Sequence, residues 1–244
     1  MPVEVQSKDL GDLNTAKISI IIPTLNEQEN IKAAIATTQH STNIEVIVVD
    51  GGSQDDTVAI TQSLGIKIIS SLPSRAIQMN TGAIAASGEI LLFLHADTRL
   101  PIGFDQMIRT ALQQPKTVAG AFVLQINDPS WGLRWIERGV YWRSHFLQMP
   151  YGDQAIFVTK AVFQQTGNFP ELPIMEDFEL IRRLKRIGKI IILPVPVITS
   201  ARRWLQKGIV KTTLLNQIVI IAYFLGVSPQ RLRNWYRQEK LKRI

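Results

Sequence analysis

The chain has 244 residues, of which 45% are hydrophobic and 19% are charged, and this composition excludes a disordered protein. It contains no cysteine, which excludes disulfides, thiol catalysis and cysteine metal sites and fits a reducing cytoplasm. The net charge of +7 is uneven, because ten basic residues and one acid give residues 201–244 a charge of +9 and leave −2 for the rest.

Chain length and composition predict one α/β domain with appended ends. We expect a polar N-terminal segment at residues 1–17, a main domain at 18–204, and an amphipathic, basic helical extension at 205–244 packed on that domain. The N-terminal segment lacks the apolar core of a signal peptide, which favours a cytoplasmic protein.

Short apolar runs alternate with amphipathic segments along the first hundred residues. The predicted strands are residues 18–22, 44–49, 66–69 and 90–94, and the predicted helices between them are residues 27–37, 54–64 and 75–86. This alternation is typical of βαβ units and a parallel sheet. Ser53 is the expected N-cap of the second helix, with Asp56 in its first turn.

Polar residues follow three of these strands, at the points where the strands end. They are Pro23-Thr24-Leu25-Asn26-Glu27, Asp50-Gly51-Gly52 and His95-Ala96-Asp97. Ligand sites in parallel sheets lie beyond the carboxyl ends of the strands, so we expect these segments to converge on one crevice.

These segments, in this order, resemble those of family 2 glycosyltransferases, and the match extends from residue 18 to residue 204. Its further motifs are Gln78-Met79-Asn80-Thr81-Gly82-Ala83 and Ser87-Gly88-Glu89. The resemblance implies a GT-A fold, a mixed and mainly parallel sheet flanked by helices. Within the family, the chain most resembles the rSAM/selenodomain-associated transferase 2 subgroup, often labelled as arsenosugar-biosynthesis glycosyltransferases. The residues behind this narrower match are Leu94 to Thr98, Tyr151-Gly152-Asp153-Gln154, Met175-Glu176-Asp177 and Ser200-Ala201-Arg202-Arg203-Trp204.

The resemblance implies that the donor is a nucleoside diphosphate sugar, linked to UDP or GDP. The residues implied in binding its nucleotide and diphosphate are Pro23, Thr24, Asn26, Glu27, Asp50, Gly52, Arg75, Ala96 and Arg203. Simpler interpretations exist: Asp50 opens a turn, Glu27 is a favourable charge near a helix start, and Arg75 is a solvated surface charge. The family pattern has a second Asp where this chain has Gly51, which leaves the nucleotide open.

The family's metal motif is Asp-x-Asp, and this chain has His95-Ala96-Asp97 in its place. Asp97 is therefore the implied ligand of Mg²⁺ or Mn²⁺, and His95 is either a second ligand or a packed ring. One carboxylate suffices if donor phosphate oxygens and waters complete the octahedral shell. We therefore expect weak metal binding in the absence of nucleotide.

An acidic pair, Glu176-Asp177, opens a helical pattern in which apolar and basic residues alternate. A charge pair at a helix N-terminus explains it without function. By resemblance, Asp177 is instead the base that deprotonates the acceptor hydroxyl, and Glu176 supports or orients it. Two adjacent carboxylates cannot both ionise freely, so we expect one of them to have a raised pKa. The implied reaction is a one-step displacement with inversion.

Three residues are candidates for contacts with the acceptor or the donor sugar: Asp153, Gln154 and Trp204. A purely structural role in a glycine-flanked loop explains the first two equally well. Arg202-Arg203-Trp204 resembles the Gln-x-x-Arg-Trp signature of polysaccharide synthases, but Ser200 stands where that Gln would be. Transfer of a single sugar to an unidentified hydroxyl acceptor is therefore favoured over polymerisation.

Two apolar segments have no role in this scheme. Residues 131–146 interleave Trp, Val and Phe with charged residues, as either a buried helix or an exposed face for an amphiphilic acceptor. Residues 214–227 are too short to span a bilayer, so a core helix is the main expectation. The alternative is a helix in the interface plane of an anionic inner leaflet, which the basic tail would attract.

A different class of function is a basic module that binds nucleic acid or a membrane surface on a degenerate transferase fold. The basic tail favours it, whereas Asp97 and the acidic pair argue against it, because binding alone needs no base or metal position. No nucleic acid is expected as a partner. A nucleotidyltransferase would normally have a Gly-rich, basic loop after the first strand, which this chain lacks. The sequence leaves a homodimer open.

Overall fold

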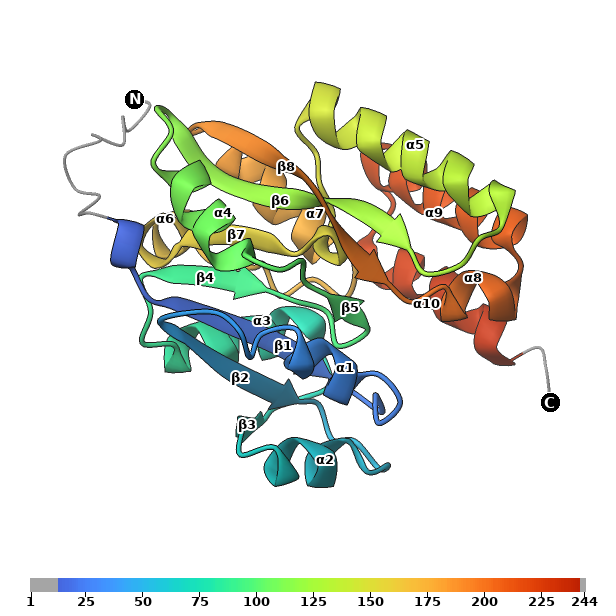
Figure 1. Cartoon of the computed structure of the whole chain (residues 1–244). Helices are drawn as coiled ribbons and strands as arrows, with labels where there is room; N and C mark the ends of the chain where they lie inside the picture. The colour runs from blue at the N-terminus through green and yellow to red at the C-terminus, as the bar shows by residue number, and fades with distance from the viewer. Residues whose placement is uncertain (1–12, 242–244) are drawn as a thin grey trace.

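A mixed eight-stranded sheet forms the centre of the protein, in the order β3-β2-β1-β4-β7-β6-β8-β5 (Figure 1). The structure is a computed structural model that describes residues 13–241, so the expectation for residues 1–12 and the basic residues Lys242 and Arg243 lie outside it. The strands are β1 Ile18–Thr24, β2 Ile44–Asp50, β3 Lys67–Ser70, β4 Ile90–Phe93, β5 Thr98–Arg99, β6 Thr117–Ile126, β7 Ile156–Thr159 and β8 Lys189–Thr199.

Helices follow nearly every strand. They are α1 Ile31–Ala36, α2 Thr57–Ser63, α3 Arg75–Ala85, α4 Phe104–Leu112, α5 Trp131–Leu147, α6 Lys160–Gln165, α7 Glu176–Leu184, α8 Arg202–Lys207, α9 Ile209–Phe224 and α10 Pro229–Leu241. Two short 3₁₀ turns complete the set, η1 at Leu13–Thr15 and η2 at Gly152–Gln154. All the strands and helices predicted up to residue 94 are confirmed, with ends displaced by four residues at most.

The first four strands are parallel, as predicted, because each is joined to the next by a helical crossover. The register pairs Thr24 with Asp50 across β1 and β2, so these two strands end at the same level. The second half of the sheet is mixed: β7 is antiparallel to β4 and to β6, whereas β6 and β8 are parallel. The GT-A architecture is thus present, together with the expected helical tail.

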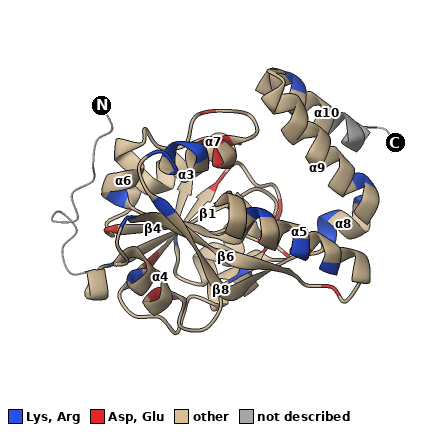
Figure 2. Ribbon diagram, turned by 90° about the horizontal axis from the view of Figure 1, so that it is seen from above, with Lys and Arg blue, Asp and Glu red and all other residues tan. Residues whose placement is uncertain are grey.

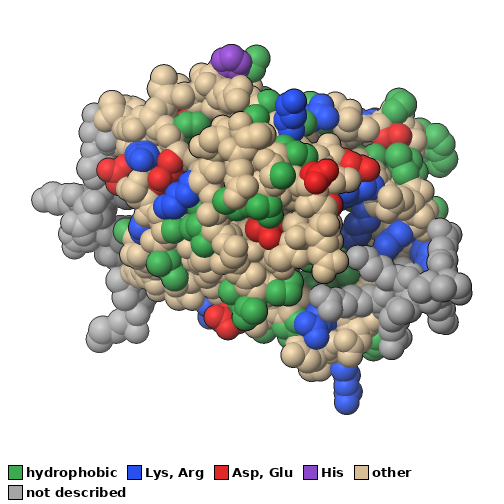
Figure 3. Space-filling view, turned by 90° about the horizontal axis from the view of Figure 1, so that it is seen from below, with side chains coloured by type: hydrophobic (Ala, Val, Ile, Leu, Met, Phe, Trp, Pro, Cys, Tyr) green, Lys and Arg blue, Asp and Glu red, His purple; other side chains and the backbone are tan. Residues whose placement is uncertain are grey.

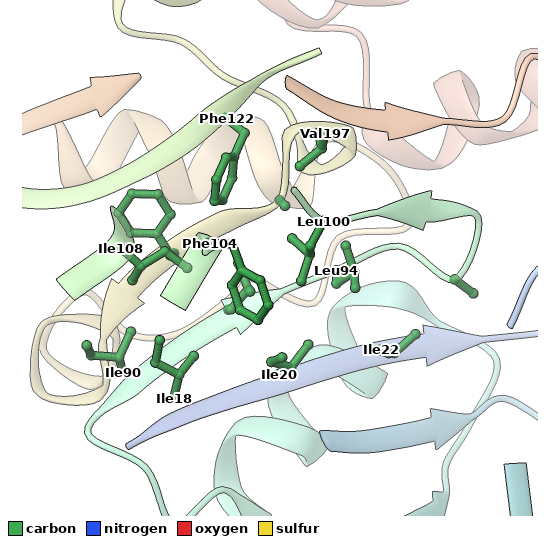
Figure 4. Packing of buried hydrophobic residues seen from close by; sticks show 14 of the residues in the cluster. Ile18, Ile20, Ile22, Ile90, Leu94, Leu100, Phe104, Ile108, Phe122 and Val197 are labelled. Carbon is green, nitrogen blue, oxygen red and sulfur yellow. The ribbon is translucent and has the colours of Figure 1, made fainter. Parts of the chain in front are cut away.

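Side chains alternate along β1 into two hydrophobic clusters, one on each face of the sheet. Ile18, Ile20 and Ile22 point to the face covered by α1 and α4, where Phe104 and Ile108 pack against them (Figure 4). Ile21 points to the opposite face, covered by α3, α6 and α7. The β1 strand is buried at every position, which explains why its sequence is apolar except at Ser19 and Thr24.

The prediction that Ser53 caps α2 is wrong. The helix begins at Thr57, and the Ser53 hydroxyl donates instead to Asp50 Oδ1. Asp55 closes the start of the helix in its place, because its carboxylate accepts from the backbone N–H and the hydroxyl of Thr57. The residues expected to form the first turn of the helix instead belong to a polar turn that follows β2.

The expectation that residues 214–227 form a core helix is also wrong. In α9 the buried residues are Thr212, Val219 and Ala222, and several large apolar side chains are exposed. The buried side packs on Phe178 of α7 and Leu232 of α10 in a third hydrophobic cluster. In a view from above, α9 and α10 lie to one side of the sheet, beyond α5 and α8 (Figure 2). Within residues 13–241, no helix is both long and apolar enough to cross a membrane.

Candidate active site

A pocket of about 550 Å³ opens at the carboxyl ends of β1 and β4, between the sheet and the C-terminal helices. Its walls are the loop after β1, the start of α3, residues 95–97, the η2 turn, the start of α7, and residues of α5, α8, α9 and α10. Seen from below, the surface is hollowed beside the C-terminal helices, and Lys and Arg side chains gather along the hollow (Figure 3).

Most of the residues predicted from sequence meet in this pocket. Those that line it are Pro23, Thr24, Glu27, Arg75, His95, Ala96, Asp97, Asp153, Glu176, Asp177, Arg203 and Trp204. The structure places Asn26, Asp50, Gly52 and Gln154 behind this lining, in supporting positions. Three strand ends do converge, but only two of them present side chains to the pocket.

Asp50 is buried and hydrogen-bonded within its own turn. Its Oδ2 accepts from the backbone N–H groups of Gly52 and Ser53 at 2.8 and 2.9 Å, and its Oδ1 accepts from the Ser53 hydroxyl. This arrangement agrees with the simpler interpretation, in which Asp50 closes the turn after β2.

The loop after β1 is attached to that turn by hydrogen bonds in both directions. Asn26 donates its backbone N–H to Ser53 Oγ and accepts from the Gln54 N–H through its side chain. Beneath the loop, buried Gln78 Nε2 donates to the carbonyls of Thr24 and Val49, each at 2.8 Å. Gln78 thereby fixes the ends of β1 and β2 relative to α3.

The side chain of Glu27 enters the pocket and forms an ion pair with Arg202, whose Nη2 lies 2.7 Å from Glu27 Oε1. This contact joins the loop after β1 to α8 across 175 residues of sequence. The sequence analysis named Arg202 only as part of a motif and missed this pairing, since no local pattern links the two segments.

Two further carboxylates face the pocket, Asp97 and Asp153. Burial, followed by the nearby charge of Glu27, raises the pKa of Asp97. Burial also raises the pKa of Asp153 to about 6, against the opposing effect of Arg143, and the charges of Asp177 and Asp97 add to the increase. Asp153 Oδ1 is buried and has no hydrogen-bond partner in the described chain. Both carboxylates would therefore be stabilised by a cation in the pocket.

Asp177 lies in the first turn of α7, where the exposed N–H groups and the helix dipole favour a negative charge. Its Oδ2 accepts from the Gly152 N–H at 2.8 Å, and its Oδ1 accepts from the N–H of Phe178 at 2.7 Å. Met175, just before the acidic pair, has a φ of 70°, a left-handed conformation that costs a non-glycine residue about 1 kcal/mol or more. The chain thus bends sharply immediately before the acidic pair.

Glu176 points away from Asp177 toward α3, where its Oε1 lies 2.7 Å from Arg75 Nε. Burial, opposed by Arg75, raises the pKa of Glu176, and the charge of Asp177 adds to the increase. The carboxylate with the raised pKa is therefore Glu176, the partner of the predicted base. Arg75 is held at the pocket by this ion pair and is not a free surface charge.

His95 lies beside Asp177 at the η2 turn. Burial, followed by the charge of Arg75, lowers the pKa of His95 to about 4, so the imidazole is neutral at pH 7. A Cβ atom on Gly152 would lie 3.0 Å from His95 Nε2 and 3.2 Å from Asp177 Oδ2. Both separations are shorter than ordinary Cβ contacts, so glycine lets His95 and Asp177 approach the turn without being displaced.

The opposite wall is more apolar and comes from the helices. Its apolar residues include Ile136 and Val140 of α5 and Val219 and Ile220 of α9. Two stacked pairs frame it: the guanidinium of Arg143 lies 3.4 Å from the ring centre of Tyr151, and that of Arg203 lies 4.3 Å from Tyr236. Burial, followed by the charge of Arg75, lowers the pKa of Arg203 to about 10, so it stays protonated at pH 7.

Trp204 lines the pocket, and its indole Nε1 is buried without a hydrogen-bond partner among residues 13–241. Gln154, in contrast, is fully buried and has a full set of partners. Its Oε1 accepts from Arg143, Ser144 and the Tyr151 N–H, and its Nε2 donates to the Phe122 carbonyl. Gln154 therefore holds the η2 turn in place rather than facing the pocket.

A comparison with protein families identifies the chain. The model described as "Glycosyl transferase family 2" matches residues 19–168, more than half of the sequence. The chain belongs to this family. The matched range covers β1 to α6 and ends before Asp177, so the predicted base and the helical wall of α8 to α10 lie beyond it.

Curated relatives match shorter stretches. Glycosyltransferase AglE of Haloferax volcanii is 38% identical over 91 residues, which are 33% of this chain and 30% of that protein. Glucosyl-3-phosphoglycerate synthase of Mycobacterium tuberculosis is 31% identical over 104 residues, 36% of this chain and 32% of that protein. The chain thus covers about a third of the length of these relatives.

Solved structures share the fold. A mannosyltransferase of Pyrobaculum calidifontis, in complex with GDP-Man and Mn²⁺, superposes with a TM-score of 0.61 at 19% identity, over 75% of this chain and 56% of that one. TarS of S. aureus in complex with UDP-GlcNAc gives 0.59 at 18% identity, over 75% and 58% of the two chains. At this identity the likeness establishes the GT-A fold of this family 2 member.

Several pocket residues of this family 2 chain were missed or given no role in the sequence analysis. They are Gln78, Arg143, Tyr151, Asn216, Arg233 and Tyr236. Tyr151 and Gln78 belong to quoted motifs, which was a usable signal. The residues of α9 and α10 follow no motif, and only the tertiary fold brings them to the pocket.

Proposed function

We propose that the protein transfers one sugar from a nucleoside diphosphate sugar to an acceptor hydroxyl, with inversion at the anomeric carbon. The observation that carries this proposal is the position of Asp177. Two backbone N–H groups hold its carboxylate at the pocket, which Arg75 and Arg203 also line. A carboxylate fixed in such a cleft is suited to act as a general base.

In the proposed reaction Asp177 accepts the proton of the acceptor hydroxyl as its oxygen attacks the anomeric carbon. The bond from that carbon to the diphosphate oxygen breaks in the same step, and the nucleoside diphosphate leaves with the electron pair. Arg75 and Arg203, both protonated, lie where they would stabilise the developing negative charge. Glu176 positions Arg75 through their ion pair.

The donor is the next part of the proposal. The solved neighbours include a complex with GDP-Man and one with UDP-GlcNAc, so both nucleotide classes remain candidates here. Pro23, Thr24, Glu27 and Ala96 would line the nucleotide side of the pocket, with Asn26, Asp50 and Gly52 shaping it from behind. The narrower resemblance to the arsenosugar-type subgroup stays a prediction, and it names no acceptor.

A divalent metal fits the residues at this site. Among the described residues no group of three or more His, Cys, Asp or Glu side chains forms a complete metal site. Asp97 would be the protein ligand, and buried Asp153 Oδ1, which has no hydrogen-bond partner among residues 13–241, is available nearby. His95 Nε2 lies toward Gly152 and Asp177, which favours a packing role. Bound with the donor, Mg²⁺ or Mn²⁺ would neutralise diphosphate charge.

Calorimetric titration with UDP and with GDP, each with and without Mn²⁺, tests the proposal. We expect one nucleotide to bind, and its affinity to fall when Mn²⁺ is omitted. Asp97→Asn should remove the metal effect while leaving the fold intact by circular dichroism. A folded protein that binds neither nucleotide would contradict the proposal and favour the basic binding module.

A further inference from the structure

Helices α5 and α9 each carry a stripe of exposed apolar side chains. In α5 the stripe consists of Trp131, Trp135, Trp142 and Phe146. In α9 and its C-cap it consists of Val210, Leu214, Ile218, Ile221 and Leu225, with exposed fractions between 52% and 79%. Both sets recur at spacings of three, four or seven residues, so each lies along one face of its helix.

The two stripes adjoin at the starts of their helices. The first turns of α5 and α9 meet where a Cβ on Gly132 would contact Ile209 at 3.5 Å, and beyond this contact the two helices run apart in the view from above (Figure 2). In each helix the opposite face is turned inward: Ile136 and Val140 of α5, and Asn216 and Ile220 of α9, line the pocket. We call the outward face, made of the nine residues of both stripes, the apolar face.

Exposed basic residues lie next to the apolar face. Residues 201–236 contain six Lys or Arg residues and no Asp or Glu; Arg203 and Arg233 line the pocket and Arg202 pairs with Glu27. Lys211, which follows Val210 of the α9 stripe, is exposed, as is Arg231 at the start of α10. On α5, Arg138 lies within the stripe, with its guanidinium 5.1 Å from the ring centre of Trp135. The surface therefore combines an apolar centre with a positive border.

We propose that the apolar face docks the protein onto an anionic lipid bilayer, with α5 and α9 lying in the plane of the headgroups. Three Trp side chains on one stripe favour the membrane interface, where amphipathic rings are enriched. The basic border matches the negative leaflet. A second copy docked on this face would bring two positive borders together, and nucleic acid offers little apolar surface to the stripe.

Flotation of the full chain with lipid vesicles tests the proposal. The probes are vesicles of phosphatidylcholine alone and vesicles of equal parts phosphatidylcholine and phosphatidylglycerol, at low and high salt. We expect binding to the anionic vesicles that weakens with salt, together with a blue shift of tryptophan emission. The double variant Trp135→Gln/Ile218→Gln should reduce vesicle partitioning about tenfold or more, because two large apolar side chains no longer enter the interface.

The matched control is Ile84→Gln/Ile102→Gln, which removes two apolar side chains with exposed fractions of 80% and 93% from outside the apolar face. It should change partitioning less than about twofold. Equal binding by both double variants, or no binding of the folded wild type to anionic vesicles, would overturn the proposal. So would a dimer, detected by analytical ultracentrifugation, that the Trp135/Ile218 variant dissociates while vesicles bind neither form. Nucleotide titration on the same variants keeps this outcome separate from that of the proposed activity.

Discussion

The sheet-side wall and the helical wall of the pocket are each stabilised by a different kind of interaction. On the sheet side, backbone and side-chain hydrogen bonds fix the loops: Gln78 bridges Thr24 and Val49, and Asp50 closes its turn. On the helical side, apolar contacts and cation–π contacts dominate. An example of the second kind is the contact between Arg203 and the ring of Tyr236. Hydrogen bonds fix directions, whereas apolar contacts mainly fix proximity. We therefore expect the sheet wall to set donor geometry, and the helical wall to tolerate change more readily.

Asp177 lies at the junction of the two walls and provides the strongest test. Asp177→Asn should lower kcat about 10³-fold, because the amide can still accept the Gly152 hydrogen bond but cannot take a proton. Steady-state kinetics with the identified donor measures this loss. Glu171→Gln, at an exposed loop position, is the control and should retain full activity. A kcat of Asp177→Asn within about tenfold of wild type would exclude it as the base.

The hydrogen-bonded wall should respond strongly to the loss of one buried side chain. Gln78→Ala should lower the free energy of unfolding by about 2 kcal/mol, because two buried hydrogen bonds, to the carbonyls of Thr24 and Val49, are lost. Urea denaturation measures the change. Gln217→Ala on the helical wall, where the side chain is exposed, should change it by less than about 0.5 kcal/mol. Similar losses in both variants would remove the distinction between the walls.

A third test asks whether the helical wall contributes to donor binding. Arg203→Ala should weaken nucleoside diphosphate binding about tenfold by calorimetry, since one protonated guanidinium facing the diphosphate is lost. Among the described residues its side chain stacks on Tyr236 and donates to Asn216 at 3.3 Å, so the melting temperature should fall by only about 2–4 °C. Arg231→Ala, at an exposed position of α10, is the control. If Arg203→Ala binds the nucleoside diphosphate as tightly as the wild type, the helical wall does not contribute to donor binding through Arg203.

Glu45, at the end of β2 away from the pocket, allows the hydrogen-bonded half of the sheet to be tested by the pH dependence of its stability. Burial tends to raise the pKa of Glu45, but hydrogen bonds from Ser19 and Ser87 and the charge of Lys17 outweigh it and lower the pKa to about 2. This lowered pKa stabilises the fold above about pH 4.5, and the effect is lost as pH falls toward 2.

Glu45→Gln should therefore reduce the free energy of unfolding by about 1 kcal/mol at pH 7, after allowance for the partial exposure of the side chain. The difference from wild type should shrink steadily as denaturation is repeated toward about pH 3. A difference that is constant with pH would show that the carboxylate charge has no part in it.

The sequence by itself determined the first half of the sheet and most of the sheet-side site. The apolar runs at β1, β2, β3 and β4 have the length and composition of buried parallel strands, and their polar ends follow the strands directly. Because parallel strands end at one edge, placing Thr24 and Asp97 at the same pocket required only the order of the elements. The acidic pair was likewise recognisable at the start of α7.

The tertiary structure decided which side chains turn inward. Asp50 and Gln154 are polar residues in matching motifs, yet hydrogen bonds to other groups of the protein hold both away from the pocket. The pairing of Glu27 with Arg202 spans 175 residues of sequence. In α9, the apolar residues that face α7 and α10 are packed, and those on the other side are exposed. Local sequence largely determines where strands, helices and turns form. Whether a given side chain is buried depends on which distant segment packs against it, and that is a property of the whole fold.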